Sequence, residues 1–231
     1  MREIVLDTET TGFEPGEGDR IVEIGAIELF NHMPTGRTYH QYINPERKMP
    51  SSAFEVHGLG DDFLADKPKF AEIGLDFLEF IGPDSRLVIH NAKFDMKFLN
   101  AELSWAKMEL IANERALDTL AIARRKFPGS PASLDALCRR FSIDNSSRTL
   151  HGALLDSEIL AEVYLELIGG RQPGFGLQLV NDTKGKGAQS DTWRPSPRPT
   201  PLPPRLTAQE NEAHVAFVAK IGEAAIWKRY D

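Results

Sequence analysis

The chain has 231 residues, of which 41% are hydrophobic and one, Cys138, is a cysteine. This size and hydrophobic content suit one packed domain with an appendage, and a single cysteine excludes an internal disulfide. No apolar run is long enough to span a membrane, no basic-then-apolar leader opens the chain and no Cys/His cluster has zinc spacing, so we expect a cytoplasmic protein.

The charge is distributed unevenly along the chain. Residues 171–231 carry nine Lys/Arg against six Asp/Glu, a net of +3, so residues 1–170 carry −10 within the total of −7. An acidic domain is a poor candidate for duplex binding, which normally needs a basic surface. It is compatible with an acidic active site that recruits Mg²⁺ or Mn²⁺ to meet a phosphate.

The order of the predicted elements indicates an α/β domain with a mixed central sheet flanked by helices. Apolar periodicity and β-branched residues distinguish the helices from the strands, and Ser133 is a plausible helix cap. In chain order we expect strands at 2–7, 20–30 and 37–44, a helix at 69–82, a strand at 86–90, a helix through Phe94, Phe98 and Leu99, and helices at 116–127, 133–141 and 156–169.

The composition changes after Gly169-Gly170. Residues 171–206 are rich in Gly, Ser and Pro, which is typical of an extended linker. Thr207 and Glu210 then form a capping-box pattern before a helical segment. The sequence therefore predicts a domain over residues 1–170, a flexible linker over 171–206 and a short C-terminal helix within 207–231.

Four acids and a histidine stand in three separate strings. Asp7 and Glu9 in "VLDTETTG" point to the same face of a strand, where they raise each other's pKa unless a cation lies between them. Asp95 follows a later strand in "NAKFD", and His151 and Asp156 lie in "LHGALLD" near the last helix start. Each residue alone has an ordinary explanation, such as a solvated strand end, a first-turn acid or a cap. Their combination predicts a divalent metal site.

In this order the strings resemble the three motifs of the DEDDh 3′–5′ exonucleases, whose domain has a ribonuclease H-like fold. The resemblance covers residues 2–170 and includes "IVEIGAIE", "VHGL", "LVIHNAKFD", "SLDALCRRF" and "RTLHGALLDSEILAEVYL". Within that family the strings are similar to the proofreading exonucleases of bacterial DNA polymerase III. The resemblance implies that the protein removes mismatched nucleotides from single-stranded 3′ ends of DNA.

The resemblance also implies a role for each residue of the constellation. Asp7, Glu9, Asp95 and Asp156 would hold two divalent metal ions, Mg²⁺ or Mn²⁺, and His151 would take a proton from the attacking water. The alternative subclass has a tyrosine four residues before the last acid, where this chain has Gly152.

Further residues would contact the terminal nucleotide. Thr10, His57 and Phe94 would bind it together with Asp7, Glu9 and Asp156, although a core position explains Phe94 equally well. Asn91 would orient the turn or a metal-bound water rather than bind a metal, and Asp118 would cap a helix rather than act as a fifth acid. Relatives often carry an acid five residues before the histidine of the V-H-G motif; this chain has Ser52 there, which puts that contact in doubt.

Two partners are implied beyond the DNA. The C-terminal helix has an apolar stripe that would bind the catalytic (alpha) subunit of polymerase III, with Trp227 as the anchor; it consists of Ala213, Phe217, Ile221, Ala224 and Trp227. Residues 172–177, "QPGFGL", Gln172 to Leu177, are similar to the hexapeptides that bind sliding clamps, and a structureless linker start is the alternative.

Two other functions remain open from the sequence. An RNA-trimming 3′–5′ exoribonuclease of the same superfamily would use the same four acids. A non-catalytic subunit that only braces a polymerase would keep the fold, but it would have no need of all five catalytic positions.

Overall fold

The computed structural model describes residues 1–146, 148, 150–169, 206–222 and 226. The chain divides into two units, residues 1–177 and 178–231, which are described separately. Most of the expected linker, the hexapeptide at 172–177, and Ala224 and Trp227 of the expected stripe lie outside the described residues.

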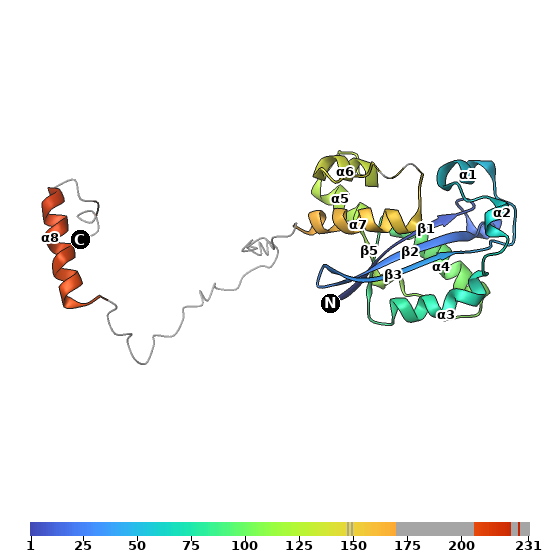
Figure 1. Ribbon diagram of the computed structural model, residues 1–231, viewed down its shortest axis with the longest axis horizontal. Helices are drawn as coiled ribbons and strands as arrows, with labels where there is room; N and C mark the ends of the chain where they lie inside the picture. Colours follow the sequence, from blue (N-terminus) through green and yellow to red (C-terminus); the bar gives the residue numbers. More distant parts are fainter. Residues whose placement is uncertain (147, 149, 170–205, 223–225, 227–231) are drawn as a thin grey trace, which may run out of the picture. The chain divides into compact units, whose positions relative to one another are not determined.

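The first unit is built on a mixed sheet, as predicted, and the sheet has five strands rather than the four expected (Figure 1). The strand order is β3-β2-β1-β4-β5; β1 is antiparallel to β2 and parallel to β4, which is parallel to β5. The strands are β1 (Arg2–Thr10), β2 (Ile21–Phe30), β3 (Met33–Tyr42), β4 (Arg86–Ile89) and β5 (Ala116–Asp118).

Helices cover both faces of this sheet (Figure 1). The helices α3 and α4 lie on one face, and α5, α6 and α7 lie on the other. The helices of the first unit are α1 (Ser51–His57), α2 (Asp61–Leu64), α3 (Phe70–Ile81), α4 (Ala92–Trp105), α5 (Thr119–Lys126), α6 (Leu134–Phe141) and α7 (Ala153–Ile168), with 3-10 turns η1 (Pro15–Glu17) and η2 (Asn113–Arg115).

Side chains of β1 alternate between these two helical layers. Ile4 and Leu6 belong to the large core cluster formed with α3 and α4. Val5 packs instead with Tyr164 of α7, and the Tyr164 hydroxyl donates to Glu3 Oε1 at 2.5 Å. Odd-numbered residues of β1 therefore face α7, and even-numbered residues face α4.

Several predicted boundaries were wrong. β1 runs three residues past Asp7, because its antiparallel pairing with β2 continues to Thr10. The third strand occupies 33–42 rather than 37–44, because a tight turn at Asn31 and His32 starts its pairing with β2 earlier. Residues 116–118, expected in a helix, form β5, because they pair with β4 at the sheet edge. The short helices α1 and α2 were not predicted.

The predicted helix caps are confirmed, although the helix expected at 116–127 begins at Thr119 and the helix expected at 156–169 begins at Ala153. The Ser133 side chain accepts a hydrogen bond from Ala136 N, and Asp118 caps α5 by accepting from Leu120 N. In the second unit α8 (Ala208–Ile221) begins with the expected capping box of Thr207 and Glu210. Every helix within the described ranges is too short or too polar to span a bilayer.

Helix α7 lies unusually close to β2 at Gly25. The Ser157 hydroxyl donates to Gly25 O at 2.9 Å. A Cβ at position 25 would lie 2.1 Å from Leu154 N and 2.2 Å from Ala153 C. These are backbone atoms at the start of α7, so they cannot rotate away. The absence of a side chain at Gly25 sets the distance between the sheet and the helix that carries Asp156.

We expect Gly25→Ala to lower the free energy of unfolding by about 3 kcal/mol, because the added methyl group must push α7 off the sheet. Thermal denaturation measures this effect. Gly16→Ala is the matched control, since its Cβ would meet nothing nearer than Glu14 Oε1 at 3.6 Å. Equal melting temperatures for the two variants would contradict the close-packing argument.

Candidate active site

The four acids and the histidine of the sequence constellation line one cavity of about 570 Å³. Asp7 and Glu9 come from β1, Asp95 from the first turn of α4, and Asp156 from the first turn of α7. His151 lies two residues before α7 begins. Residues up to 149 positions apart in the chain thus meet at one edge of the sheet.

The sheet topology explains this convergence. β1 and β4 are parallel neighbours, so their C-terminal ends lie at the same edge. Asn91 follows β4 in the left-handed conformation, with φ 65°, and turns the chain into α4. The Asn91 backbone N–H donates to Asp118 Oδ1 at 3.0 Å, so Asp118 fixes the turn as well as capping α5.

Alternation along β1 divides the acids between the two helical layers. Asp7 and Glu9 are odd-numbered and belong to the face that α7 covers with Asp156. Thr8 faces the other way, and its hydroxyl donates to Asp95 Oδ1 of α4 at 2.8 Å. One strand thereby supplies two acids directly and holds the third through a hydrogen bond.

Mutual repulsion and burial make the ionised acids unfavourable. Burial raises the pKa of Asp7 well above its usual range, and the charges of Asp95, Glu9 and Asp156 raise it further. Burial, with the charges of Asp156 and Glu23, raises the pKa of Glu9 to about 8. Burial also raises the pKa of Asp95 to about 7, although the hydrogen bond from Thr8 acts against it. Near neutral pH the cavity therefore favours either protons or cations.

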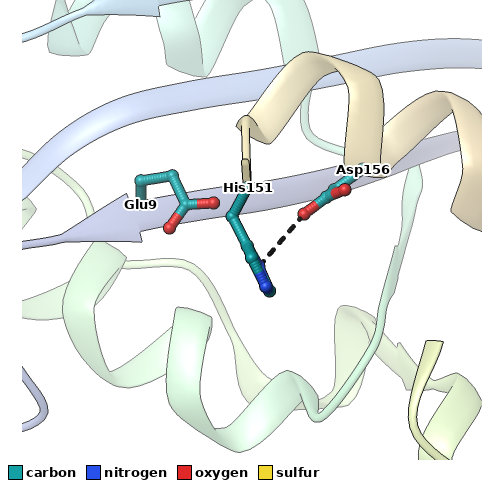
Figure 2. A group of neighbouring side chains, drawn as sticks. All are labelled: Glu9, His151 and Asp156. Atoms are coloured by element: carbon teal, nitrogen blue, oxygen red, sulfur yellow. Dashed lines mark ion pairs between the residues drawn. The ribbon is translucent and has the colours of Figure 1, made fainter. Parts of the chain in front are cut away.

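The histidine lies beside the acids, as Figure 2 shows. Its Nδ1 atom is 3.5 Å from Asp156 Oδ2, and its backbone N–H donates to Val56 O, next to the last residue of α1. The ring is about half exposed, at 47%. Burial of the rest of the ring and the nearby Arg148 charge lower the pKa of His151, against the opposite effect of Asp156 and Asp135. The imidazole is therefore neutral at neutral pH, the protonation state that a general base needs.

The donor set fits divalent metal ions. Glu9, His151 and Asp156 each present a ligand atom, and these atoms lie within 4.8 Å of one another. Asp7 and Asp95 add carboxylates to the same cavity. Carboxylate oxygens are the ligands that Mg²⁺ and Mn²⁺ prefer. A bound cation would also relieve the repulsion that raises the pKa values.

The three expected nucleotide contacts are placed differently from one another. Phe94 lines the cavity, and its ring also packs on Phe98 of the core at 5.0 Å, so both alternatives for it apply. Thr10 and His57 are buried and are not among the residues that line the cavity. Burial lowers the pKa of His57, and the nearby Thr10 backbone acts against this effect. The buried Nε2 atom of His57 has no hydrogen-bond partner among the described residues.

Sequence reasoning missed Arg148 and Asp135. Arg148 donates to both carboxylate oxygens of Asp156 and to Asp135 Oδ1. The signal was present, because clustered carboxylates require a cation and an arginine stands three residues before His151. The requirement for positive charge was attributed to metal ions alone, whereas the structure places a guanidinium in the cluster.

We expect the melting temperature of the metal-free protein to fall as pH rises from about 6 to about 8.5. Glu9 has a folded pKa of about 8 against an ordinary 4.5, so between these values the folded state holds protons that the unfolded state has released. This stabilisation is complete below the ordinary value and is lost as pH rises through 8. Melting curves in a chelator measure it. Saturating Mg²⁺ should remove the decline, Glu9→Gln should reduce it, and a rising melting temperature in chelator would contradict the assignment.

Comparison with known proteins places these features among nucleases. A family model described as "Exonuclease" matches residues 4–164. The chain is 50% identical to "DNA polymerase III subunit epsilon" of Rickettsia conorii, over 97% of this chain and 98% of the relative. It is 42% identical to the protein of that name from Escherichia coli K12, over 98% of this chain and 97% of the relative.

Solved structures show the same fold. One described as "Exonuclease X in complex with 5' overhanging duplex DNA" is 25% identical, with a TM-score of 0.56, covering 71% of this chain and 90% of that one. The nuclease domain of 3'hExo, a DEDDh family member bound to rAMP, is 18% identical, with a TM-score of 0.62, covering 72% of this chain and 91% of that one. The expected ribonuclease H-like fold is thus confirmed.

Proposed function

The chain belongs to the exonuclease family, among the DNA polymerase III epsilon subunits, and from this membership we propose that its acidic cavity removes mismatched 3′-terminal nucleotides from DNA by two-metal-ion phosphodiester hydrolysis. One observation carries the proposal. Asp7, Glu9, Asp95, Asp156 and His151, which come from three distant strings, line a single cavity.

Each side chain has a part in the proposed reaction. The four carboxylates would hold two divalent ions, Mg²⁺ or Mn²⁺, which would supply the positive charge that the phosphoryl transition state needs. His151 is neutral, faces the cavity, and accepts the proton of the attacking water, the role of a general base. Thr8 holds Asp95 in place through its hydroxyl. Phe94 gives the cavity an apolar wall against which a terminal base can lie.

The negative net charge of the first unit favours unpaired 3′ ends of DNA as substrates over paired ones. Residues 1–170 carry a net charge of −10. Because binding to duplex DNA draws much of its affinity from basic residues that release counterions, this domain should bind a duplex weakly. A mismatched terminus costs little to unpair, so it reaches the cavity more readily than a paired one. The substrate we propose is accordingly a single-stranded 3′ end.

Hydrolysis of 3′-labelled oligonucleotides tests the proposal. The products should be 5′-mononucleotides, formed only with a divalent metal and faster from a mismatched than from a paired primer terminus. A matched RNA strand serves as the competing substrate. Faster hydrolysis of RNA would favour the exoribonuclease alternative, and activity undiminished by a chelator would refute the two-metal assignment.

The second unit provides an exposed apolar helix for a partner. Ala213, Phe217 and Ile221 recur at steps of four along α8 and are exposed. A single helix of this length is marginal in water, so binding to a partner would stabilise it. We assign that partner as the catalytic subunit of the polymerase. A tether of this kind raises the concentration of the nuclease near the primer end.

We expect truncation after Gly170 to leave hydrolysis of free single strands nearly unchanged and to abolish co-elution with the polymerase catalytic subunit. The cavity residues all lie before residue 170, whereas α8 is removed. Gel filtration of the mixed proteins and a single-strand assay measure the two effects. Retained tight binding, or loss of nuclease activity, would contradict the tether.

A further inference from the structure

Arg148 makes more contacts in the cavity than any role described so far explains. Its Nε and Nη2 atoms donate to the two carboxylate oxygens of Asp156, the latter at 2.8 Å. Its Nη1 donates to Asp135 Oδ1 at 2.9 Å. Its Nη2 also lies 2.8 Å from His151 Nδ1. The Arg148 side chain is only 9% exposed, so its ion pair with the buried Asp156 is shielded from water.

The contact with His151 fixes the state of the imidazole. A guanidinium can only donate hydrogen bonds, so His151 Nδ1 must be the acceptor. The neutral ring then carries its proton on Nε2. The lone pair on Nδ1, which lies on the side of Asp156, is therefore engaged by Arg148 and is not free to take a proton from water.

The contact with Asp156 has a parallel effect on metal binding. Both oxygens of this carboxylate accept hydrogen bonds from the guanidinium, so a cation that binds Asp156 must compete with Arg148 for the same carboxylate. Arginine stays charged at all physiological pH values, so a change in pH does not release the carboxylate. Only a competing cation, or a movement of Arg148, makes Asp156 available.

Asp135 offers the guanidinium a place to remain after such a movement. It lies in the first turn of α6, and its side chain is 46% exposed. It already accepts hydrogen bonds from Arg148 and from Asn145 Nδ2. Asp135 can therefore keep one end of Arg148 while the contacts with Asp156 and His151 break.

We propose that Arg148 is an internal latch, which occupies Asp156 and His151 in the metal-free protein and withdraws toward Asp135 when divalent cations bind. This inference rests on the proposed function, since it assumes that Asp156 is a metal ligand. The latch neutralises the repelling acids while no metal is present. It also keeps the proton acceptor blocked until the metal site is filled.

Calorimetric titration of the full chain with Mn²⁺ tests the competition. Arg148→Gln should lower the dissociation constant about tenfold or more, equivalent to about 1.4 kcal/mol, because Asp156 no longer has to give up a bidentate partner. Arg124→Gln is the matched control: Arg124 lines the same cavity, and the described residues include none that forms an ion pair with it. Its removal should change the constant by less than about threefold, through long-range charge alone.

A double-mutant cycle separates a latch from simple charge removal. Asp135→Asn should weaken Mn²⁺ binding in the parent chain, because Arg148 loses its alternative partner. In the Arg148→Gln background the same change should have almost no effect. Independent, additive effects of the two substitutions would overturn the latch. Should Arg148→Gln fail to fold, Arg148→Lys keeps the charge without the bidentate geometry and should also tighten Mn²⁺ binding.

Nitrogen-15 NMR of the histidines gives a readout independent of affinity. In the metal-free protein His151 should carry its proton on Nε2, and saturating Mg²⁺ should release this fixed tautomer, as should Arg148→Gln. Equal dissociation constants and equal tautomers in the parent chain and Arg148→Gln would overturn the latch and leave the proposed function intact. Absence of stoichiometric Mn²⁺ binding in every variant would overturn both.

Discussion

Asp7→Asn should lower exonuclease turnover by about three orders of magnitude or more, while the melting temperature of the metal-free protein rises. The lost carboxylate is a proposed metal ligand, and a thousandfold loss corresponds to about 4 kcal/mol of transition-state stabilisation. The rise in stability has a separate cause. Asp7 is half-buried beside Asp95, Glu9 and Asp156, so a neutral amide of the same shape removes an unfavourable charge from the cluster.

Two measurements are needed because the effects oppose each other. Single-turnover hydrolysis of a labelled oligonucleotide gives the rate, and melting curves in a chelator give the stability. Asp62→Asn is the control, since Asp62 is an exposed acid at the start of α2. It should alter neither quantity appreciably. A slow but destabilised Asp7→Asn protein would indicate damage to the fold, and a nearly normal rate would remove Asp7 from the metal site.

His151→Gln should lower kcat by about 10² to 10⁴ and change KM by only a few-fold, because a general base acts in the proton-transfer step. The pH profile gives a second signature. The pKa of His151 is lowered, mainly by burial and by Arg148. The midpoint of the acid limb in the pH–rate profile should therefore lie below pH 6.5, the ordinary pKa of histidine. That limb should be missing in the variant.

His32→Gln is the matched control for this substitution. His32 Nδ1 pairs with Glu3 Oε2 at 2.8 Å and does not line the cavity. Its replacement should keep kcat and the acid limb. A variant of His151 that raises KM without lowering kcat would assign the ring to substrate binding instead of proton transfer.

Much of the fold could be predicted because its strongest signals are local. The apolar spacing of residues 70–81 and the caps at Ser133 and Asp118 depend on near neighbours in the chain, and the structure has them as predicted. The strand at 116–118 could not be predicted in this way. Its three residues are partly buried and gain their strand conformation from pairing with β4, about 30 positions away.

The same distinction between local signals and long-range contacts applies to the residues of the candidate site. The spacing of Asp7 and Glu9 specifies one face of a strand, which is a local property. Arg148 stands three residues before His151, which hints at a place near the acids, but its pairing with Asp135 of α6 and Asp156 of α7 depends on tertiary contacts. The short helix α1 was missed for a similar reason, since its long-range contact, the hydrogen bond from His151 N to Val56 O, joins residues far apart in the chain.

Because side chains of β1 alternate between its two faces, the number of residues between Glu3 and each acid decides which helical layer the acid faces. Asp7 and Glu9 face α7 because each is an even number of residues from Glu3, which Tyr164 of α7 contacts. One residue inserted between Glu3 and Asp7 would turn both acids toward the α4 layer and bring Thr8 to the α7 side, while leaving the composition of the strand almost intact. Two inserted residues would restore the facing. The facing of the two acids thus depends on whether an even or an odd number of residues separates them from Glu3. An insertion or deletion of one residue in β1 should therefore be tolerated less well than a change of residue type at its buried apolar positions.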